Sequence, residues 1–366
     1  MAHVIETLGA GGAETLLAEL TARLDPARFR SRVFPLDGPL DLRPRFDKAG
    51  IEVDPLGIAP ARRPLACLSA LTRRLRRFRP HVVHTHLYYA NVLGRLAAWM
   101  TRDARCVSTL HNPDYTFEGR RSLFFAGKKA LDRLTGRRNA ALLAVSRAVA
   151  EDFERHLGWR GIRVVPNGVD VEHYSPGPAP PAADWPEGGL RLLHVGRLHP
   201  QKGHRVLIEA LARARGRGLD AGLALVGEGP LRGELAEQVA RLGLDGRVRF
   251  LGRRDDVREL LRAADVFVFP SLYEAAGIAL LEAMACGKPV IASRTGGIVE
   301  IVREGVDGML VAPGDAEELA SAIGRLAAEP ALRSRLGAAA RSRALEFDIR
   351  RTVRAVEEVY EEVASA

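Results

Sequence analysis

The chain has 366 residues, of which 47% are hydrophobic and 27% charged, and this length and composition predict a globular protein of two domains. Its three cysteines are odd in number and lack metal-like spacing, and no run of about 18 apolar residues occurs, which excludes a disulfide framework, a cysteine zinc site and a membrane-spanning helix. We therefore expect a cytoplasmic protein. The formal net charge of +9 favours acidic partners, which include nucleic acid, an anionic membrane surface and phosphorylated substrates.

The first half of the chain alternates short β-branched runs with helical patterns. Helices are expected at segments such as 13–24 and 91–100, and strands at 3–7, 31–36, 81–86, 105–110, 141–146 and 162–167. This alternation predicts a parallel sheet covered by helices. Residues 175–189, SPGPAPPAADWPEGG, have no period and are interpreted as an interdomain linker.

The alternation starts again after residue 189. A helix is expected at 230–243, and strands at 190–196, 221–229, 247–252, 264–270, 288–293 and 307–313. The sequence therefore predicts two doubly wound α/β domains. Ligands of such sheets bind at the carboxyl ends of the strands, so we expect the functional site in a cleft between the domains.

The first strand runs into a glycine-rich loop, LGAGGAETLL. Gly9, Gly11 and Gly12 precede a helix whose first turn carries Glu14. Glycines let the backbone approach a ligand closely, and the free N–H groups of a helix start attract anions. A tight strand-to-helix turn is the alternative interpretation, and Glu14 is then explained by the helix dipole.

The loop HVGRLHPQKGH follows the first strand of the second domain and carries two cations. Arg197 and Lys202 lie five residues apart in this loop. A guanidinium that binds two oxygens and a compact ammonium are what a departing diphosphate needs. A solvated basic loop is the alternative.

Two carboxylates, Glu274 and Glu282, flank a predicted helix start in PSLYEAAGIALLEAMACGKP. The helix is expected to begin at Gly277 and to end before Gly287. The N–H groups of Ala276, Gly277 and Ile278 would face phosphate or sugar oxygens. Glu274 is then placed to bind sugar hydroxyls and Glu282 a ribose diol, whereas a loop carboxylate and a surface helix residue are the alternatives.

These motifs together resemble the retaining glycosyltransferases of family 4, which have the GT-B fold. The spacing of EAAGIALLE matches the family's pattern of two glutamates separated by seven residues. The segments GGAETLL, HVVHTHLYYANVLGRLAA, STLHN, AVSRAVAEDF, VVPNGVD, HVGRLHPQKGH, LVGEGPLR and FLGRRDDV resemble the family in the usual order. The resemblance implies an acceptor-binding domain at 1–168, a nucleotide-sugar-binding domain at 169–345, and a C-terminal helix at about 346–366 that packs back on the first domain.

The resemblance also implies roles for individual residues. Arg197 and Lys202 would hold the donor diphosphate, and Glu282 the ribose. Glu274 and the amides around Gly277 would hold the transferred sugar. His111 would lie close to the anomeric carbon, and Gly11 and Gly12 would face the phosphates and the acceptor.

The expected reaction transfers a sugar with retention of configuration, and the leaving phosphate oxygen takes the acceptor proton. No cofactor or metal is expected, because Arg197, Lys202 and the helix-start amides supply the charge that a divalent cation would give. Asp255 and Asp256 are interpreted as a helix cap. Ala275 and Ala276 stand where many members carry a glycine and a bulkier residue, which favours a UDP-linked hexose or N-acetylhexosamine, with GDP-mannose as the alternative. The acceptor, a glycan, a lipid-linked molecule or a small molecule, is not readable.

Several side chains keep two interpretations. His111 is either catalytic or a satisfied polar residue, and His84 and His86 are either loop structure or acceptor contacts. Asn167 and Gly168 are interpreted as the turn that closes the first domain. Arg253 and Arg254 lie near the nucleotide base or in solvent.

Two other functions compete with the transferase. A sugar-nucleotide epimerase would need acid and base carboxylates on both faces of the sugar, and the first-domain loops offer few. A nucleic-acid-binding protein would explain the charge and LTRRLRRFRP, but no binding motif accompanies that segment, so no nucleic-acid partner is expected.

Residues 117–139 combine apolar side chains with many cations. The apolar ones are Phe124, Phe125, Leu131 and Leu134, and the basic ones are Arg120, Arg121, Lys128, Lys129, Arg133, Arg137 and Arg138. This composition predicts reversible binding to an anionic membrane, at its inner face. An ordinary amphipathic surface helix is the alternative.

Overall fold

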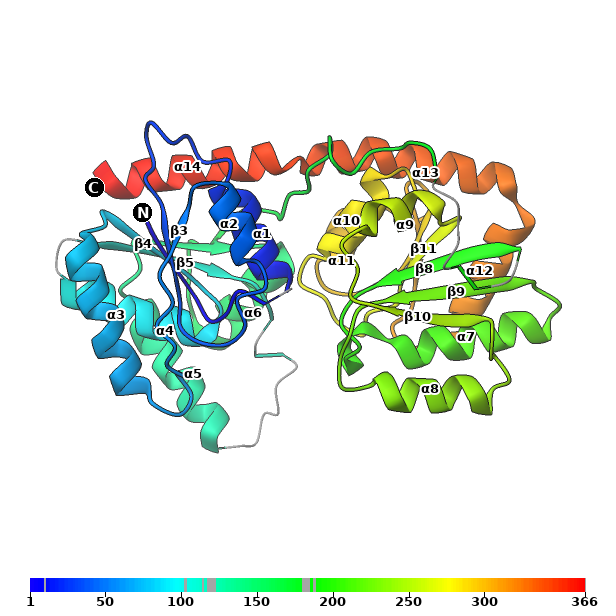
Figure 1. Ribbon diagram of the computed structural model, residues 1–366, viewed down its shortest axis with the longest axis horizontal. Coiled ribbons are helices and arrows are strands. Elements are labelled where there is room, and N and C mark those ends of the chain that lie inside the picture. Colours follow the sequence, from blue (N-terminus) through cyan, green and yellow to red (C-terminus); the bar gives the residue numbers. More distant parts are fainter. Residues whose placement is uncertain are drawn as a thin grey trace. The chain divides into compact units, whose positions relative to one another are not determined.

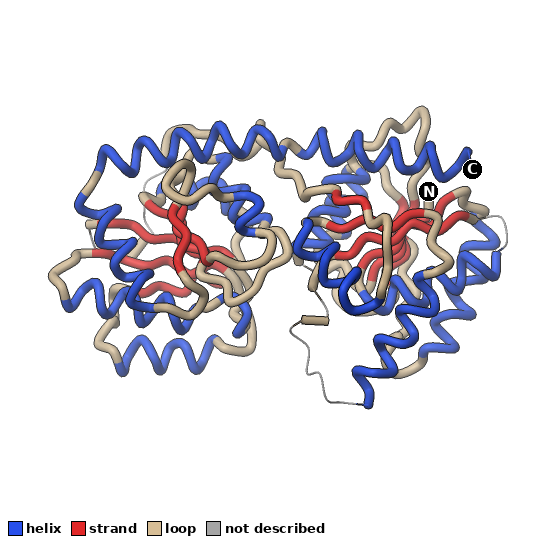
Figure 2. The backbone as a smooth tube through the Cα atoms, turned by 180° about the vertical axis from the view of Figure 1, so that it is seen from behind, coloured by secondary structure: helices blue, strands red, loops and turns tan. Residues whose placement is uncertain are grey.

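The computed structural model describes residues 1–9, 11–101, 104–113, 115–116, 123–179, 185–186 and 189–365. The chain divides into two compact units, Met1–Gly168 with Ile349–Ala366, and Val169–Asp348. Each unit is built on its own parallel sheet with helices on both sides (Figures 1 and 2). The predicted fold class of two doubly wound α/β domains is confirmed.

The sheet of the first unit has seven strands in the order β3-β2-β1-β4-β5-β6-β7, all paired in parallel. These strands are β1 (Ala2–Ile5), β2 (Arg32–Pro35), β3 (Glu52–Val53), β4 (Val82–His86), β5 (Arg105–Leu110), β6 (Ala141–Ala144) and β7 (Arg163–Val164). The direction of winding changes between the neighbours β1 and β4, which makes their carboxyl ends the switch point of the sheet.

Helices cover both faces of this sheet, so its central strands are buried on both sides. They are α1 (Gly12–Thr21), α2 (Arg43–Lys48), α3 (Pro64–Phe78), α4 (Tyr88–Thr101), α5 (Leu123–Gly136), α6 (Arg147–Leu157) and α14 (Ile349–Ser365). One face carries Val4 and Val83 in an apolar core with α3 and α4. Because side chains alternate along a strand, the neighbouring His3 and His84 point to the other face, which α1 and α14 cover.

The helix boundaries follow from local sequence. The Ser146 side chain accepts a hydrogen bond from the N–H of Val149 and begins α6, and Gly158 ends it in a left-handed conformation with φ of 69°. In α14 the apolar side chains recur at helical spacing and are buried, among them Val353, Val356 and Tyr360. The C-terminal helix thus packs on the first unit through one apolar face.

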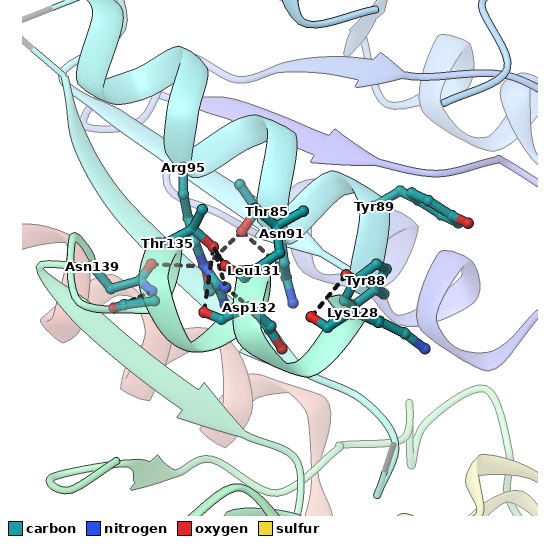
Figure 3. A network of polar contacts seen from close by, with 12 residues as sticks. Thr85, Tyr88, Tyr89, Asn91, Arg95, Lys128, Leu131, Asp132, Thr135 and Asn139 are labelled. Carbon is teal, nitrogen blue, oxygen red and sulfur yellow. Dashed lines mark hydrogen bonds and ion pairs between the residues drawn. The ribbon is translucent and has the colours of Figure 1, made fainter. Parts of the chain in front are cut away.

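A buried ion pair joins α4 to α5 (Figure 3). The Arg95 guanidinium pairs with Asp132, and the two side chains are 0% and 2% exposed. The Nε of Arg95 donates to Ser108 Oγ at 2.9 Å, and the hydroxyl of Tyr115 donates to the second oxygen of Asp132 at 2.6 Å. Such a pair is stable only with this dense hydrogen bonding, because each charge has lost its hydration.

The second unit has a six-stranded parallel sheet in the order β10-β9-β8-β11-β12-β13. Its strands are β8 (Leu190–Val195), β9 (Ala221–Val226), β10 (Val248–Gly252), β11 (Val266–Phe269), β12 (Val290–Ser293) and β13 (Met309–Val311). Its helices are η1 (Pro200–Lys202), α7 (His204–Gly216), α8 (Arg232–Arg241), α9 (Val257–Ala263), α10 (Ile278–Ala285), α11 (Ile298–Ile301), α12 (Ala316–Ala328), α13 (Pro330–Ala344) and η2 (Leu345–Phe347). Here β8 and β11 are the neighbours between which the winding changes.

The chain passes between the units twice, and the two passages lie side by side. The N–H of Val169 donates to the carbonyl of Phe347 at 2.9 Å, and Val169 and Asp348 form a parallel bridge. A Cβ on Gly168 would lie 2.4 Å from the Cα of Ile349, so only glycine allows this approach. The proline-rich stretch at 175–189 lies within the second unit, so its interpretation as the interdomain linker was wrong.

The buried pair gives a stability prediction. We expect Asp132→Ala to lower the free energy of unfolding of the first unit by about 3–5 kcal/mol, because it leaves the Arg95 charge buried without a counterion. Urea unfolding measures the change. Asp47→Ala is the matched control, since its pair with Arg43 is exposed on both sides and is worth at most about 0.5 kcal/mol. Equal losses in the two variants would contradict the prediction.

Candidate active site

In the second unit, the loops after β8 and β11 are joined at the carboxyl edge of the sheet. The N–H of Leu272 donates to the carbonyl of Gln201 at 2.8 Å, and the Gln201 side chain donates to the carbonyl of Tyr273 at 3.2 Å. Gly203 has a φ of 69°, and a Cβ there would lie 2.0 Å from the carbonyl oxygen of Pro270. A glycine is therefore required where the two loops meet.

These joined loops pair Lys202 with Glu274. The Lys202 Nζ lies 2.5 Å from Glu274 Oε2, and the side chains are 16% and 9% exposed. The hydroxyl of Ser271 donates to the same carboxylate oxygen at 3.3 Å, and the ammonium lies 5.1 Å from the centroid of the Phe269 ring. The predicted diphosphate cation and the predicted sugar carboxylate are therefore direct partners in the unliganded protein.

Arg197 has a different environment. It lies in the same loop, but its side chain is exposed and makes no ion pair within the described part of the chain. An exposed guanidinium at the carboxyl end of β8 is accessible to an anionic ligand without breaking any internal contact.

The predicted helix after Glu274 is α10 (Ile278–Ala285), and Gly277 is its N-cap residue. Gly277 is left-handed, with φ of 74°, and no side chain caps the helix start. The loop before it is held from below, because the N–H of Gly297 donates to the carbonyl of Glu274 at 3.0 Å. The first amides of α10 therefore remain available at the carboxyl edge of β11.

The side chains around this helix start differ in burial. Ala275 and Ala276 are 4% and 5% exposed, so their methyl groups are packed. Glu282 lies near the end of α10, is partly exposed and makes contacts with other residues. Asp256 is the N-cap residue of α9, but its side chain makes no capping hydrogen bond and pairs with Arg254 instead at 2.6 Å. The interpretation of this carboxylate as a side-chain cap was therefore wrong.

In the first unit, the glycine-rich loop leads into α1, with Gly11 as the N-cap residue and Gly12 as the first helical residue. No side chain caps this helix start either. The Glu14 side chain folds back and accepts a hydrogen bond from the Thr7 hydroxyl at 3.0 Å. The carboxylate thus ties the helix to the end of β1, as the helix-dipole interpretation expects.

His111 follows β5 and is 9% exposed. Its Nε2 lies 3.1 Å from Nδ1 of His86, the last residue of β4. Burial lowers the pKa of His111 to about 4, so the ring is neutral near pH 7.

A layer of histidines continues inward from this pair. His84 bonds to the Tyr360 hydroxyl at 2.6 Å through Nδ1 and to the Thr109 hydroxyl at 2.7 Å through Nε2. Ring nitrogens of His3, His84 and His86 all lie within 4.8 Å of one another. Because both nitrogens of His84 are engaged, the three rings do not offer three open metal ligands.

A pocket of about 360 Å³ of empty space lies beside this layer within the first unit. His86, His111, Thr109 and Asn167 line it with apolar side chains from α1 and α14, among them Leu16, Leu20 and Val356. Asn167 therefore does more than form a turn, since its side chain borders the pocket that His111 also lines.

Sequence patterns did not reveal Glu6, which lies at the end of β1 beside the switch point. Its Oε1 accepts a hydrogen bond from the N–H of Tyr89, in the first turn of α4, at 2.7 Å. Burial raises the pKa of this carboxyl. Leu87, between β4 and α4, has a φ of 72°, an uncommon value for a bulky residue. A carboxylate directly after a strand at a switch point is the signal that would have identified Glu6.

Two protein-family models match the chain. The model described as Glycosyltransferase Family 4 matches residues 10–173, and the model described as Glycosyl transferases group 1 matches residues 189–329.

Curated proteins and solved structures with similar chains are numerous. A D-inositol 3-phosphate glycosyltransferase of Saccharomonospora viridis is 32% identical over 308 residues, which cover 78% of this chain and 70% of that protein. The glycosyltransferase EpsF of Bacillus subtilis is 30% identical over 321 residues, covering 80% and 78%. The crystal structure of HepE of Anabaena with UDP and glucose superposes with a TM-score of 0.84 at 26% identity and covers 98% of this chain and 99% of that one.

The buried histidines predict an acid-sensitive first unit. Burial lowers the pKa of His3, His84 and His86 well below 6.5 and that of His111 to about 4. Because the folded-state values lie below the unfolded ones, stability is complete above about pH 6.5 and falls as the pH drops toward 4, by up to about 1.4 kcal/mol per pH unit for each ring. Urea unfolding at a series of pH values measures this slope.

The variant His3→Phe removes one titrating ring and should make the slope shallower by about one proton. A free energy of unfolding that does not change between about pH 7 and 5 would contradict the assignment of neutral, buried rings.

Proposed function

The chain belongs to the family 4 glycosyltransferases, with the GT-B fold, and on this premise we propose that it transfers a hexose or N-acetylhexosamine from a UDP-linked donor to an acceptor hydroxyl with retention of configuration. HepE of Anabaena, a structural neighbour at 25% identity and a TM-score of 0.84, was crystallised with UDP-glucose, which supports a UDP-linked donor over GDP-mannose. The packed methyl groups of Ala275 and Ala276 give no added room for an N-acetyl group, so a plain hexose is favoured.

The pairing of Lys202 with Glu274 is the observation that carries the proposal. A diphosphate with two negative charges competes for the ammonium more strongly than one carboxylate does. When Lys202 turns to the diphosphate, the carboxylate of Glu274 becomes available to accept hydrogen bonds from sugar hydroxyls. One ion pair thereby keeps both groups in place before the donor binds and separates into two substrate contacts afterwards.

Charge on the departing diphosphate is stabilised by three kinds of donor in the second unit. Arg197 is exposed and unengaged among the described residues, Lys202 is a point charge on a joined loop, and the uncapped N–H groups of α10 act with the helix dipole. The leaving phosphate oxygen takes the acceptor proton, so no protein base is required in this step. Glu282 binds the ribose diol, and His111, with Gly11 and Gly12, contributes from the first unit.

Substitution of the two carboxylates separates their roles. We expect Glu282→Ala to weaken UDP binding by about 10-fold to 100-fold, because charge-assisted hydrogen bonds to the ribose are lost. Glu274→Ala should leave the affinity for UDP unchanged or higher, since it frees Lys202, and should reduce turnover of UDP-glucose. Calorimetry with UDP and with GDP, together with hydrolysis of UDP-glucose, measures both effects.

Glu237→Ala on the exposed side of α8 is the control and should match the unchanged protein in both assays. Equal losses of UDP affinity in the Glu282 and Glu274 variants would exclude separate ribose and sugar roles. Tighter binding of GDP than of UDP would exclude a uridine donor.

We also propose that the outer side of α5 and the end of α4 bind an anionic membrane surface. No helix in the described residues is long and apolar enough to cross a membrane. Leu134 is 66% exposed and Trp99 is 56% exposed, and the Arg138 guanidinium lies 4.1 Å from the centroid of a Trp99 ring. Exposed Leu131, Arg133 and Arg137 extend this surface. Phe117, Arg120 and Arg121 lie outside the described residues.

Apolar tips flanked by arginines suit the boundary between lipid headgroups and acyl chains, where each cation contributes about 1 kcal/mol. Lys128 is only partly exposed and lies 4.4 Å from the Tyr88 ring centroid, so it contributes less than the sequence alone predicts. The buried pair of Arg95 with Asp132 holds the opposite side of α5 in the protein, which leaves one face outward.

Co-sedimentation with vesicles tests this surface. Binding should need anionic lipid, should fall steeply between about 50 and 500 mM salt, and should weaken in the combined variant Arg133→Gln, Arg137→Gln and Leu134→Ser. Arg241→Gln with Arg249→Gln removes two exposed cations of the second unit and serves as the control. Equal recovery in the supernatant with neutral and anionic vesicles at low salt would exclude membrane binding.

A further inference from the structure

The hydrogen bond between the rings of His86 and His111 contains one proton whose position the surroundings decide. The two nitrogens, His86 Nδ1 and His111 Nε2, are 3.1 Å apart, and the side chains are 3% and 9% exposed. With both rings neutral, one nitrogen of the pair donates and the other accepts. Two arrangements of tautomers satisfy this bond, and they leave His111 with opposite hydrogen-bonding properties.

The other nitrogen of His86 distinguishes the two arrangements. His86 Nε2 is fully buried and has no hydrogen-bond partner among the described residues. A proton at Nε2 would create a buried N–H donor without an acceptor, whereas a lone pair there is tolerated more easily. His86 therefore carries its proton on Nδ1 and donates to Nε2 of His111.

The neighbours of His86 leave its ring no freedom to turn over. The His84 ring centroid lies 4.2 Å away, and the His3 ring is stacked at 6.3 Å. His84 is itself held at both nitrogens, by Tyr360 of α14 and by Thr109 of β5. The ring that faces His111 is thus fixed by residues from three strands and the C-terminal helix.

The consequence falls on the free nitrogen of His111. With Nε2 accepting from His86, a neutral His111 carries its proton on Nδ1. This atom has no hydrogen-bond partner among the described residues and is not one of their fully buried unpartnered atoms, so it is accessible to a ligand. Its lowered pKa keeps the ring uncharged near pH 7.

We infer that His86 is a positioning residue that locks His111 as the Nδ1–H tautomer and makes it a hydrogen-bond donor to a substrate oxygen. The inference rests on the proposed role of His111 in the transfer reaction and defines its chemistry. A donor of this kind supports an oxygen on which negative charge grows, a sugar hydroxyl or a phosphate oxygen, and does not abstract a proton. Nothing in the sequence pattern distinguishes the two nitrogens.

Nitrogen-15 NMR of the full chain with labelled histidine reports the tautomer directly, with His111 assigned by its absence from His111→Gln. We expect the unchanged protein to show a protonated Nδ1 at His111. His86→Phe removes the donor and should give a mixture of tautomers. His86→Asn places an amide N–H where Nδ1 lies and should restore the Nδ1–H form. His3→Phe alters the packing of His86 but not its hydrogen bond, and should leave the tautomer as it is.

Hydrolysis of UDP-glucose supplies a second readout. His86→Phe should lower the maximal rate by about 10-fold or more, as for loss of a transition-state donor, while His86→Asn should recover most of it and the affinity for UDP should stay unchanged in both. A protonated Nε2 at His111 in the unchanged protein would overturn the inference even if no variant folded. An unchanged tautomer in His86→Phe would overturn it as well. If the unchanged protein does not act on UDP-glucose, the proposed donor fails, and the NMR result still decides the role of His86.

Discussion

Parallel strand pairing is the constraint from which the functional geometry follows. Because each strand returns through a helix, every strand of a sheet ends at the same edge, and the residue after a strand becomes a neighbour of the residue after the next one. Lys202 and Glu274 are 72 positions apart, and His86 and His111 are 25 positions apart, yet each pair is in direct contact because β8 adjoins β11 and β4 adjoins β5. The residues that carry the chemistry are therefore brought together by backbone hydrogen bonds.

Polar groups inside the first unit are arranged in two layers on opposite faces of the sheet. On one face, Arg95 and Asp132 connect α4 and α5 through charge. On the other face, neutral histidines lie beneath α14 and connect to it through Tyr360. Charge is kept where hydrogen bonds satisfy it completely, whereas the layer that reaches His111 is uncharged, so the ring nearest the chemistry does not disturb the charges of a bound diphosphate.

The alternating pattern was sufficient to predict both sheets, the helix that begins at Gly277 and the loops that carry Arg197, Lys202 and His111. What it did not predict depends on contacts that are distant in sequence. The ion pair of Lys202 with Glu274 requires Gly203 to lie against Pro270, and Glu6 is recognised only when Tyr89 is beside it. Short pairings such as β3 carry too little periodicity to be recognised, and the proline-rich stretch at 175–189 was mistaken for a boundary because composition does not show to which unit a segment belongs.

The paired passages at Gly168 and Ile349 have a consequence for biosynthesis. A ribosome releases the second unit, Val169–Asp348, as one uninterrupted stretch, whereas the first unit lacks α14 until the final residues emerge. The layer of His3, His84 and His86 is therefore left without its cover during most of translation, although its own strands were made first. The usual order in which N-terminal domains mature first is thus reversed for the last step, because the domain begun first is completed last.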